Sequence, residues 1–249
     1  MNLHAIFSRR RLAVTALVIV AGAAAARLGI WQLDRLQQRR AFNAHVISMR
    51  HLPSLTLPVD DPLESQEYRS VQARGTFDFD HQVALRNQVH EGQYGFHLIT
   101  PLRMEDPSNG ISAILVDRGW IPAAGNEQRQ AWHRYDVSGT VQVQGVIRLG
   151  RGETVLANKV QSAASAGSVR DDFWLFVDVE QISRQLPYRV MPIYMQLDGL
   201  ENSKDLPAAV APRLDLGEGP HLGYAIQWFG LSAVLVVGYV MYVSKKEAA

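Results

Sequence analysis

The chain contains no cysteine. This absence excludes disulfide bonds, thiolate metal sites, CxxC redox chemistry and the covalent attachment of c-type haem. The charges are nearly balanced, with 25 Lys and Arg and 24 Asp and Glu. The resulting formal net charge of +1 gives no indication of a nucleic-acid partner. The sequence holds no HxH or HExxH metal motif, no GxSxG elbow and no P-loop. We therefore expect a protein that is not an enzyme.

Two long apolar runs lie near the ends of the chain, over 12–31 and 222–243. The second run contains no charged residue. As a helix rising about 1.5 Å per residue it would be roughly 33 Å long, enough to cross a bilayer core of roughly 30 Å. We therefore predict a transmembrane helix over 222–243.

The first run permits two interpretations. A basic start at Arg9–Arg11, an apolar middle and Ala24–Ala26 are typical of a cleavable signal peptide. Against cleavage, apolar residues resume after Arg27 and the run ends at Trp31, a residue type that favours the membrane interface. We predict a retained transmembrane helix over 12–31, with a signal peptide as the alternative.

Basic residues beside the two runs predict the orientation. Arg9–Arg11 precede the first run and Lys245–Lys246 follow the second, so the positive-inside rule places both termini in the cytoplasm. Arg35, Arg39 and Arg40 form a counter-signal just beyond the first run. The predicted order in a bacterial inner membrane is a cytoplasmic segment over 1–11, a helix over 12–31, a periplasmic β-rich domain over 32–221, a helix over 222–243 and a cytoplasmic segment over 244–249.

The segment between the apolar runs is predicted to be mainly β. Short runs of strand type are separated by Gly, Pro, Asn and Asp, and Val141–Gln144 alternates apolar and polar residues. This pattern favours an antiparallel sandwich or a partly closed barrel over βαβ units, which makes the fold class two transmembrane helices flanking a mainly β (α+β) domain. A polar helical extension is predicted over 34–48 and an exposed loop over 157–170. The predicted strands are 68–79, 82–87, 96–103, 112–120, 137–148, 173–179 and 190–197.

Arg118-Gly119-Trp120 ends a strongly strand-like run. An arginine and an indole at a strand end can form a docking corner for an anion or a protein. The simpler interpretation is a strand-to-loop turn with a packed tryptophan, and the residues alone favour it.

His221 stands at the entrance to the second apolar run. In a helix, His221, Tyr224 and Trp228 fall at i, i+3 and i+7 and share one face. A neutral imidazole at a membrane rim is suited to bind haem iron, the two aromatic rings could line a porphyrin, and Arg27 or Arg35 could meet its propionates. The simpler interpretation is an interfacial histidine with aromatic anchors, which the residues alone favour.

Six segments occur in a fixed order along the chain. They are LGIWQLDR at 28–35, LESQEYRSVQARGTFD at 63–78, YGFHLITPLR at 94–103, ILVDRGWIP at 114–122, GVIRLG at 145–150 and HLGYAIQWFGLSA at 221–233. Together they resemble the surfeit locus protein one family, membrane assembly factors for haem–copper cytochrome c oxidase. The resemblance implies two membrane helices around an outer domain, and a non-catalytic role in helping haem A enter oxidase subunit I, as a haem carrier. It extends no function to 157–170, where the chain departs from the family pattern.

Site residues follow from the resemblance motif by motif. It implies a haem A site at His221, Tyr224 and Trp228, with His221 as the ligand of the haem iron. The implied partners are oxidase subunit I or its assembly intermediate, haem A synthase and membrane lipid. The alternative function is a membrane-anchored scaffold that stabilises an oxidase intermediate without binding haem. The residues implied in partner binding are Trp31, Arg35, Arg74, Arg118 and Trp120.

Overall fold

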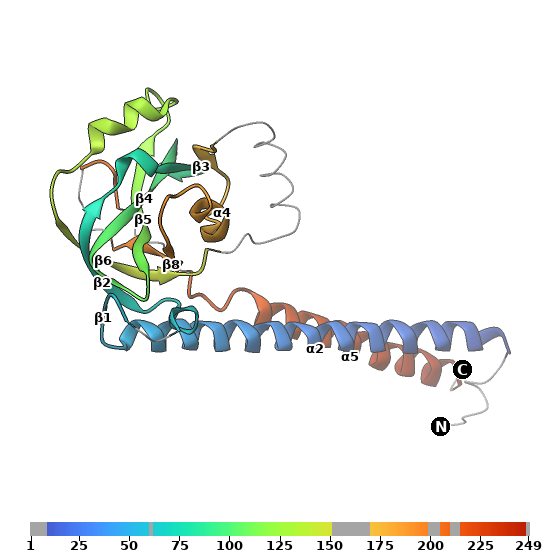
Figure 1. The fold of residues 1–249 in the computed structure, drawn as a ribbon. Coiled ribbons are helices and arrows are strands. Elements are labelled where there is room, and N and C mark those ends of the chain that lie inside the picture. Colours follow the sequence, from blue (N-terminus) through green and yellow to red (C-terminus); the bar gives the residue numbers. More distant parts are fainter. Residues whose placement is uncertain (1–8, 60–61, 151–169, 199–204, 210–214, 248–249) are drawn as a thin grey trace. The chain divides into compact units, whose positions relative to one another are not determined.

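The computed structural model describes residues 9–59, 62–150, 170–198, 205–209 and 215–247. The chain divides into two compact units, Met1–His45 with Leu214–Ala249, and Val46–Arg213. The first unit holds two long helices and the second holds the strands (Figure 1). Of the loop predicted over 157–170, all but Arg170 lies outside the described residues.

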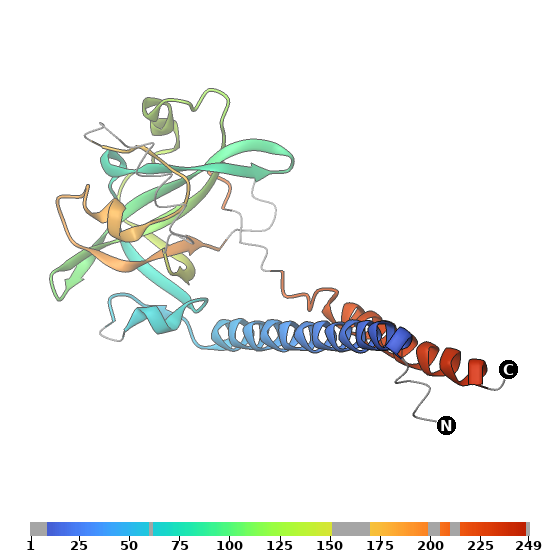
Figure 2. The same cartoon turned by 90° about the vertical axis from the view of Figure 1, so that its right-hand side faces the viewer.

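The helical unit is an antiparallel pair formed by α2 (Arg9–His51) and α5 (His221–Glu247). The two helices lie side by side in both views (Figures 1 and 2). Thr15 shares a hydrogen bond with Tyr239, and Gln32 with His221, which fixes the antiparallel direction. By length and composition both helices can cross a membrane. This confirms the prediction of apolar helices at the two ends of the chain.

The first helix continues well past its apolar part. Residues 32–51 contain neither glycine nor proline and are rich in Gln, Leu, Arg and Ala, which favour helix. The helix ends at His51, shortly before Pro53, since a residue that precedes proline disfavours helical backbone. The polar extension predicted over 34–48 is therefore confirmed.

Small residues form the contact between the two helices. Gly22, Ala25 and Gly29 are buried on one face of α2. A Cβ at Gly29 would lie 2.8 Å from the ring of Phe229, and Ser232 Oγ donates to the Gly22 carbonyl at 2.8 Å. Small side chains let helix backbones approach closely, which is how helices associate where lipid replaces water.

In the described residues of the strand unit there are eight strands and four short helices. Its longest strands are β4 and β5, which form one long hairpin. The strands are β1 (Leu55–Thr56), β2 (Ser70–Phe77), β3 (Val83–His90), β4 (Gln93–Ser108), β5 (Ile111–Pro122), β6 (Val141–Arg148), β7 (Phe173–Trp174) and β8 (Val190–Leu197). The short helices are η1 (Leu63–Gln66), η2 (Phe79–His81), η3 (Arg129–Tyr135) and α4 (Val179–Ser183).

Five strands close into a barrel in the order β2-β6-β8-β5-β4, and β2 then pairs with β4. The prediction of a mainly β domain between two apolar helices is confirmed. Of the two predicted architectures the barrel forms, and it is closed. The neighbours within it are antiparallel except for β5 and β8, which are parallel.

The strand predicted over 173–179 is much shorter than expected. Only Phe173–Trp174 pairs as a strand, and α4 begins at Val179. Asp178 explains the change, because its Oδ1 accepts from the Gln181 amide at 3.0 Å and caps the new helix. The run 173–179 is apolar enough for a strand, but apolar residues also suit the buried side of a short helix such as α4.

Gly75 is the residue at which the barrel closes. It pairs with Val141 on β6 and with Met104 on β4, so β2 passes from one neighbour to the other at this position. A Cβ at Gly75 would lie 2.0 Å from the carbonyl oxygen of Arg103. Only a residue without a side chain permits this approach.

The barrel interior is the main hydrophobic core. The side chains that fill it come from all five barrel strands and are almost fully buried. They include Val71, Ala73, Phe77, Leu102, Met104, Ile114, Val116, Val143, Ile147, Met191, Ile193 and Met195.

A second apolar cluster lies where the segment of β7 and α4 meets strands β3, β4 and β5. Trp174 and Ile182 of that segment pack with Val83, Ile99 and Leu115 of the strands, and all five are nearly inaccessible. Each buried large apolar side chain contributes on the order of 1.5–3 kcal/mol. This burial holds the segment against the strands.

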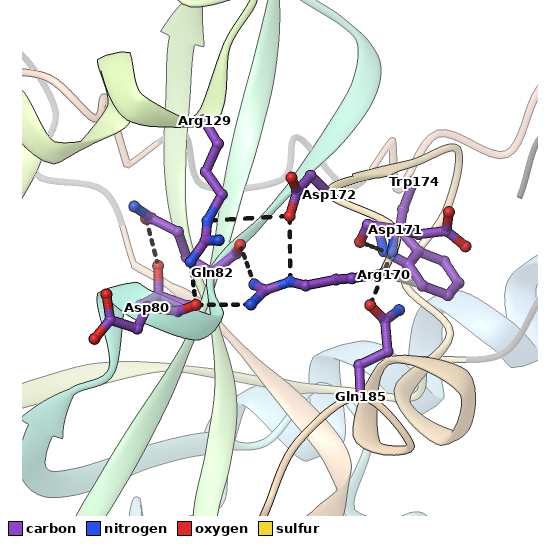
Figure 3. A network of polar contacts seen from close by, with 9 residues as sticks. Asp80, Gln82, Arg129, Arg170, Asp171, Asp172, Trp174 and Gln185 are labelled. Carbon is purple, nitrogen blue, oxygen red and sulfur yellow. Dashed lines mark hydrogen bonds and ion pairs between the residues drawn. The ribbon is translucent and has the colours of Figure 1, made fainter. Parts of the chain in front are cut away.

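A polar network fastens the start of the same segment (Figure 3). Arg170 donates to the carbonyls of Asp80 at 2.7 Å and Gln82 at 3.2 Å, and its Nε lies 3.2 Å from Asp172 Oδ1. Arg129 of η3 donates to the same Asp80 carbonyl. Burial and the neighbouring charge of Arg129 lower the pKa of Arg170, while Asp172 opposes them. The network therefore joins η2, η3 and β7 at one place.

We predict that Gly75→Ala destabilises the barrel by about 2 kcal/mol or more, because the added methyl group overlaps a backbone oxygen. Thermal unfolding of the full chain, followed by circular dichroism, measures the change. Thr76→Ala is the matched control, since Thr76 is the next residue of β2 and its side chain is exposed. Equal unfolding temperatures for the two variants would contradict the role given to Gly75.

Candidate functional site

The second long helix begins after a glycine and a proline. Gly219 has a φ of 69°, a conformation that favours glycine, and the fixed φ of Pro220 suits the first turn of a helix. α5 starts at His221, and the amide of Tyr224 donates to the Pro220 carbonyl at 3.1 Å. The local sequence thus places His221 in the first turn of α5.

His221 is half-buried and bonded to α2. Its Nδ1 lies 2.9 Å from Gln32 Oε1. An amide oxygen can only accept, so Nδ1 carries the proton in this contact and Nε2 keeps its lone pair. Gly219 leaves space beside that nitrogen, because a Cβ there would lie 3.5 Å from Nε2. His221 therefore presents one nitrogen that can bind a metal.

A pocket of about 410 Å³ lies beside His221 within the helical unit. It combines an imidazole and an aromatic ring with two guanidinium groups and two carboxylates. Arg35 donates to Gln38 Oε1 at 2.9 Å, a contact with a neutral amide that does not neutralise its charge. The lining therefore suits a ligand that has both a flat apolar part and anionic groups. The lining residues are Arg35, Gln38, Arg39, Phe42, Asp215, Gly217, Glu218, Gly219 and His221.

The pocket lining does not include Tyr224 and Trp228, which were predicted for the haem site, or Trp31, which was predicted for partner binding. Tyr224 is 46% exposed and Trp31 is 47% exposed, whereas Trp228 is half-buried one helical turn beyond the buried Ala225. In the described part of the chain these three aromatic residues are not among those lining the pocket. Their roles in haem or partner binding stay predictions.

The sequence motifs gave no site role to Gln32, Arg39 or Asn43, which are buried or half-buried on one face of α2. Residues on this face recur at alternating steps of three and four, a spacing that keeps one face of a helix towards its partner. This spacing was the available signal, since it continues the line of small residues into the polar extension. The buried or half-buried residues on the face are Gly22, Ala25, Gly29, Gln32, Leu36, Arg39 and Asn43.

Arg118 lies inside the strand unit. It is 6% exposed, and its guanidinium is 5.2 Å from the ring centre of Phe77 and 4.9 Å from that of Phe79. It also donates to the Tyr135 carbonyl. Burial lowers the pKa of Arg118 to about 10, with Asp136 opposing the shift, so the group stays charged near neutral pH. A desolvated cation between two rings gains about 2 kcal/mol, which makes Arg118 a structural residue.

Trp120 is buried in the same region. The Gly95 backbone lies against its indole, and a Cβ at Gly95 would be 2.3 Å from Trp120 Nε1. Trp120 also exchanges two backbone hydrogen bonds of 2.8 Å with Ala208. Gly119 has a φ of 118°, and a Cβ there would lie 2.2 Å from the Ala208 oxygen. The tryptophan is packed, as the simpler interpretation expected, but the expected turn does not form because β5 continues to Pro122. The packing buries the side chains that were predicted to grip a partner.

Arg74 differs from these two residues because it is on the surface. Its side chain is 66% exposed and its Nε lies 2.9 Å from Glu105 Oε2. An exposed ion pair contributes at most about 1 kcal/mol, so Arg74 is accessible to a partner at little energetic cost.

A buried acid–base pair in the barrel wall was also missed. His97 Nδ1 lies 2.9 Å from Asp117 Oδ2, and Asp117 Oδ1 accepts from the Gly119 amide at 3.0 Å. Burial alone would lower the pKa of His97, but the charge and hydrogen bond of Asp117 outweigh it and raise the pKa above its usual 6.5. The pair joins β4 and β5 and holds the backbone of β5 at Gly119. A histidine and an aspartate twenty residues apart give no local signal in the sequence.

We predict that this pair makes stability depend on pH. Because the folded pKa of His97 is raised, its stabilisation is complete below the usual value of 6.5 and is lost as pH rises through the folded pKa. Thermal unfolding of the wild type and of His97→Gln from about pH 5.5 to 8.5 measures this dependence. The stability difference should shrink as pH rises in chains that keep Asp117. It should instead grow with pH when both chains also carry Asp117→Asn, because burial alone lowers the pKa of His97. A difference that grows with pH in chains that keep Asp117 would contradict the prediction.

Comparison with known proteins identifies the family. A family model described as the SURF1 family matches residues 19–233. A SURF1-like protein of Rickettsia bellii is 30% identical over 227 residues, covering 86% of this chain and 84% of that protein. Surfeit locus protein 1 of Homo sapiens is 26% identical over 224 residues, covering 83% of this chain and 69% of that protein. The order of motifs, the two apolar helices and these matches agree, and the chain belongs to the SURF1 family.

Proposed function

We propose that this chain is a non-catalytic assembly factor for a haem–copper terminal oxidase and that it holds haem A transiently at His221. Membership of the SURF1 family supports the assembly role. The proposed partners are oxidase subunit I or its assembly intermediate, with haem A synthase as a second partner. The single observation that carries the haem part is the His221–Gln32 contact of 2.9 Å, which leaves Nε2 free beside a pocket.

The donor set fits a haem. Gln32 holds the proton on Nδ1, and a partner bond of this kind fixes the tautomer and the ring orientation of a histidine ligand. Arg35 supplies a positive charge in the same pocket for a propionate, and Phe42 supplies an aromatic surface. When bound, haem A would supply the iron porphyrin that the oxidase needs. The chain's own residues orient the imidazole and neutralise the anionic edge.

Reversible binding agrees with the nature of the pocket. Charged and polar groups outnumber apolar ones among its lining residues, and Asp215 and Glu218 lie beside the two arginines. A carrier must release its cargo, so a site with a single histidine ligand and a polar lining suits transfer better than permanent storage. The exposed Tyr224 is available to a partner or to lipid instead, whereas Trp228 is half-buried on the face of α5 that also carries Ala225 and Ser232.

The scaffold alternative is favoured by one surface feature. Arg74 and Glu105 present an exposed ion pair on the barrel, whereas Arg118 and Trp120 are buried. A scaffold that grips an oxidase subunit would use such exposed residues. Loss of oxidase in an Arg118 or Trp120 variant would follow first from a disturbed barrel.

We further propose that α2 and α5 anchor the chain in a bacterial inner membrane, with the strand unit in the periplasm and both termini in the cytoplasm. The apolar helices support the anchoring. The basic residues Arg9–Arg11 and Lys245–Lys246 beside the two helices support the orientation.

We predict that His221→Ala lowers haem occupancy at least tenfold, and that Gln32→Ala lowers affinity by roughly 10-fold through loss of the bond to the ligand histidine. The full chain is purified from cells that make haem A, and its visible spectrum is recorded. His45→Ala is the control, because His45 is an exposed histidine of α2 outside the pocket. If the wild type holds no haem, the carrier role fails and the scaffold role takes its place.

We predict that the strand unit is accessible from the periplasm. Because the chain has no cysteine, single cysteines at the exposed Ala124 and Ser244 can be labelled separately in intact cells. A membrane-impermeant maleimide should label Ala124→Cys without cell lysis, and Ser244→Cys only after lysis. The opposite pattern would reverse the proposed orientation.

A further inference from the structure

The residues just before α5 form an extended strap, Asp215–Glu218, that lies along α2. Arg39 Nε donates to the Gly217 carbonyl at 3.0 Å, and another nitrogen of Arg39 donates to the Asp215 carbonyl. Asn43 Nδ2 donates to the Leu216 carbonyl at 2.6 Å. Three consecutive carbonyls of the strap thus have donors from a single face of α2.

The last residue of the strap is held by its side chain. Arg40 Nε and Nη2 donate to the two carboxylate oxygens of Glu218 at 2.7 and 2.8 Å. Such paired bonds fix orientation as well as distance. Within the strap, the Gly217 amide donates to Asp215 Oδ1 at 2.9 Å, which closes a small turn. Every residue of the strap is therefore fixed by at least one hydrogen bond.

The strap ends close to the proposed ligand. Only Gly219 and Pro220 separate Glu218 from His221. Gly219 forms a turn with a positive φ, and Pro220, with its fixed φ, leads directly into α5. Placing Glu218 against α2 therefore limits where the imidazole can lie. The first turn of a helix lacks half of its backbone bonds and frays easily, so His221 needs support from outside α5.

We propose that Arg39, Arg40 and Asn43 are positioning residues that hold His221 in its bond with Gln32 by fastening the strap to α2. The positioning of His221 is a property of the chain itself, and its meaning for haem rests on the proposed function. The polar extension of α2 thereby supports the site through residues that lie two to three helical turns beyond Gln32.

Arg40 and Asn43 do not contribute equally. Arg40 and Glu218 are each at least half exposed, and such a pair is weak on its own because water and salt screen it. Asn43 is 8% exposed, so removing its amide leaves the strap without its buried donor. Asn43→Ala should therefore loosen the strap more than neutral changes at Arg40, whereas Arg40→Glu adds repulsion to Glu218.

The absence of cysteine permits a clean measurement of the strap. A spin label on Leu216→Cys reports its motion, since that side chain is 37% exposed while its carbonyl bonds to Asn43. We expect an ordered spectrum in the otherwise wild-type chain and a mobile one with Arg40→Glu or Asn43→Ala. The charge swap Arg40→Glu with Glu218→Arg should restore order. Arg184→Glu is the matched control, because it breaks an exposed Arg–Glu pair of α4.

The position of His221 is measured separately and without haem. In the full chain labelled with ¹⁵N-histidine, the signal that disappears in His221→Ala is assigned to His221. The wild type should show one tautomer with the proton on Nδ1. Arg40→Glu and Asn43→Ala should give a mixture of tautomers, and the charge swap should return the single form.

Haem affinity completes the test. We expect Arg40→Glu and Asn43→Ala to weaken haem A binding about fivefold, corresponding to about 1 kcal/mol, with recovery in the charge swap. A strap that stays ordered in both variants would overturn the fastening. A mobile strap with an unchanged His221 tautomer would overturn the positioning role. If the two variants change the tautomer of His221 but the wild type never binds haem, the positioning role stands and the proposed function is overturned.

Discussion

The close approach of α2 and α5 is the constraint on which the site depends. Gly22 and Gly29 carry no side chain where Val236 and Phe229 lie against them, so the helix backbones come near enough for side chains of ordinary length to bridge them. Gln32 follows Gly29 on the same face and reaches His221 at 2.9 Å. Larger residues at the glycines would push the helices apart and lengthen that bond beyond the range of hydrogen bonding.

The strand unit uses the same device for a different purpose. Gly75, Gly95 and Gly119 each stand where a Cβ would meet a backbone oxygen within about 2.2 Å. These glycines belong to the motifs by which the family is recognised, and their neighbours Arg118 and Trp120 are buried around them. The motifs thus encode closure of a barrel, and their place in the sequence does not by itself identify a binding surface.

Much of the fold could be predicted from local pattern, and much of the site could not. The length of the apolar runs predicted both helices, and short apolar runs between turn residues predicted most strands, because these patterns depend on residues close together in the sequence. Closure at Gly75 depends on pairing with both β4 and β6, which local pattern does not contain. The bond between Gln32 and His221 joins residues 189 positions apart, so position in the sequence revealed the histidine but not its partner. The buried pair of His97 and Asp117 was hidden for the same reason.

Two separate sets of polar contacts stabilise the helical unit. Among the described residues, the apolar parts of the helices are joined by the bonds of Thr15 with Tyr239 and of Ser232 with Gly22. In lipid, packing of small residues and such bonds suffice to associate two helices. The strap lies beyond these contacts, where arginine and carboxylate side chains are exposed. Pairing of the helices therefore does not require the strap, and the strap is free to serve the position of one residue, His221. Because the two sets of contacts are separate, the pairing of the helices can stay intact while the geometry at His221 changes.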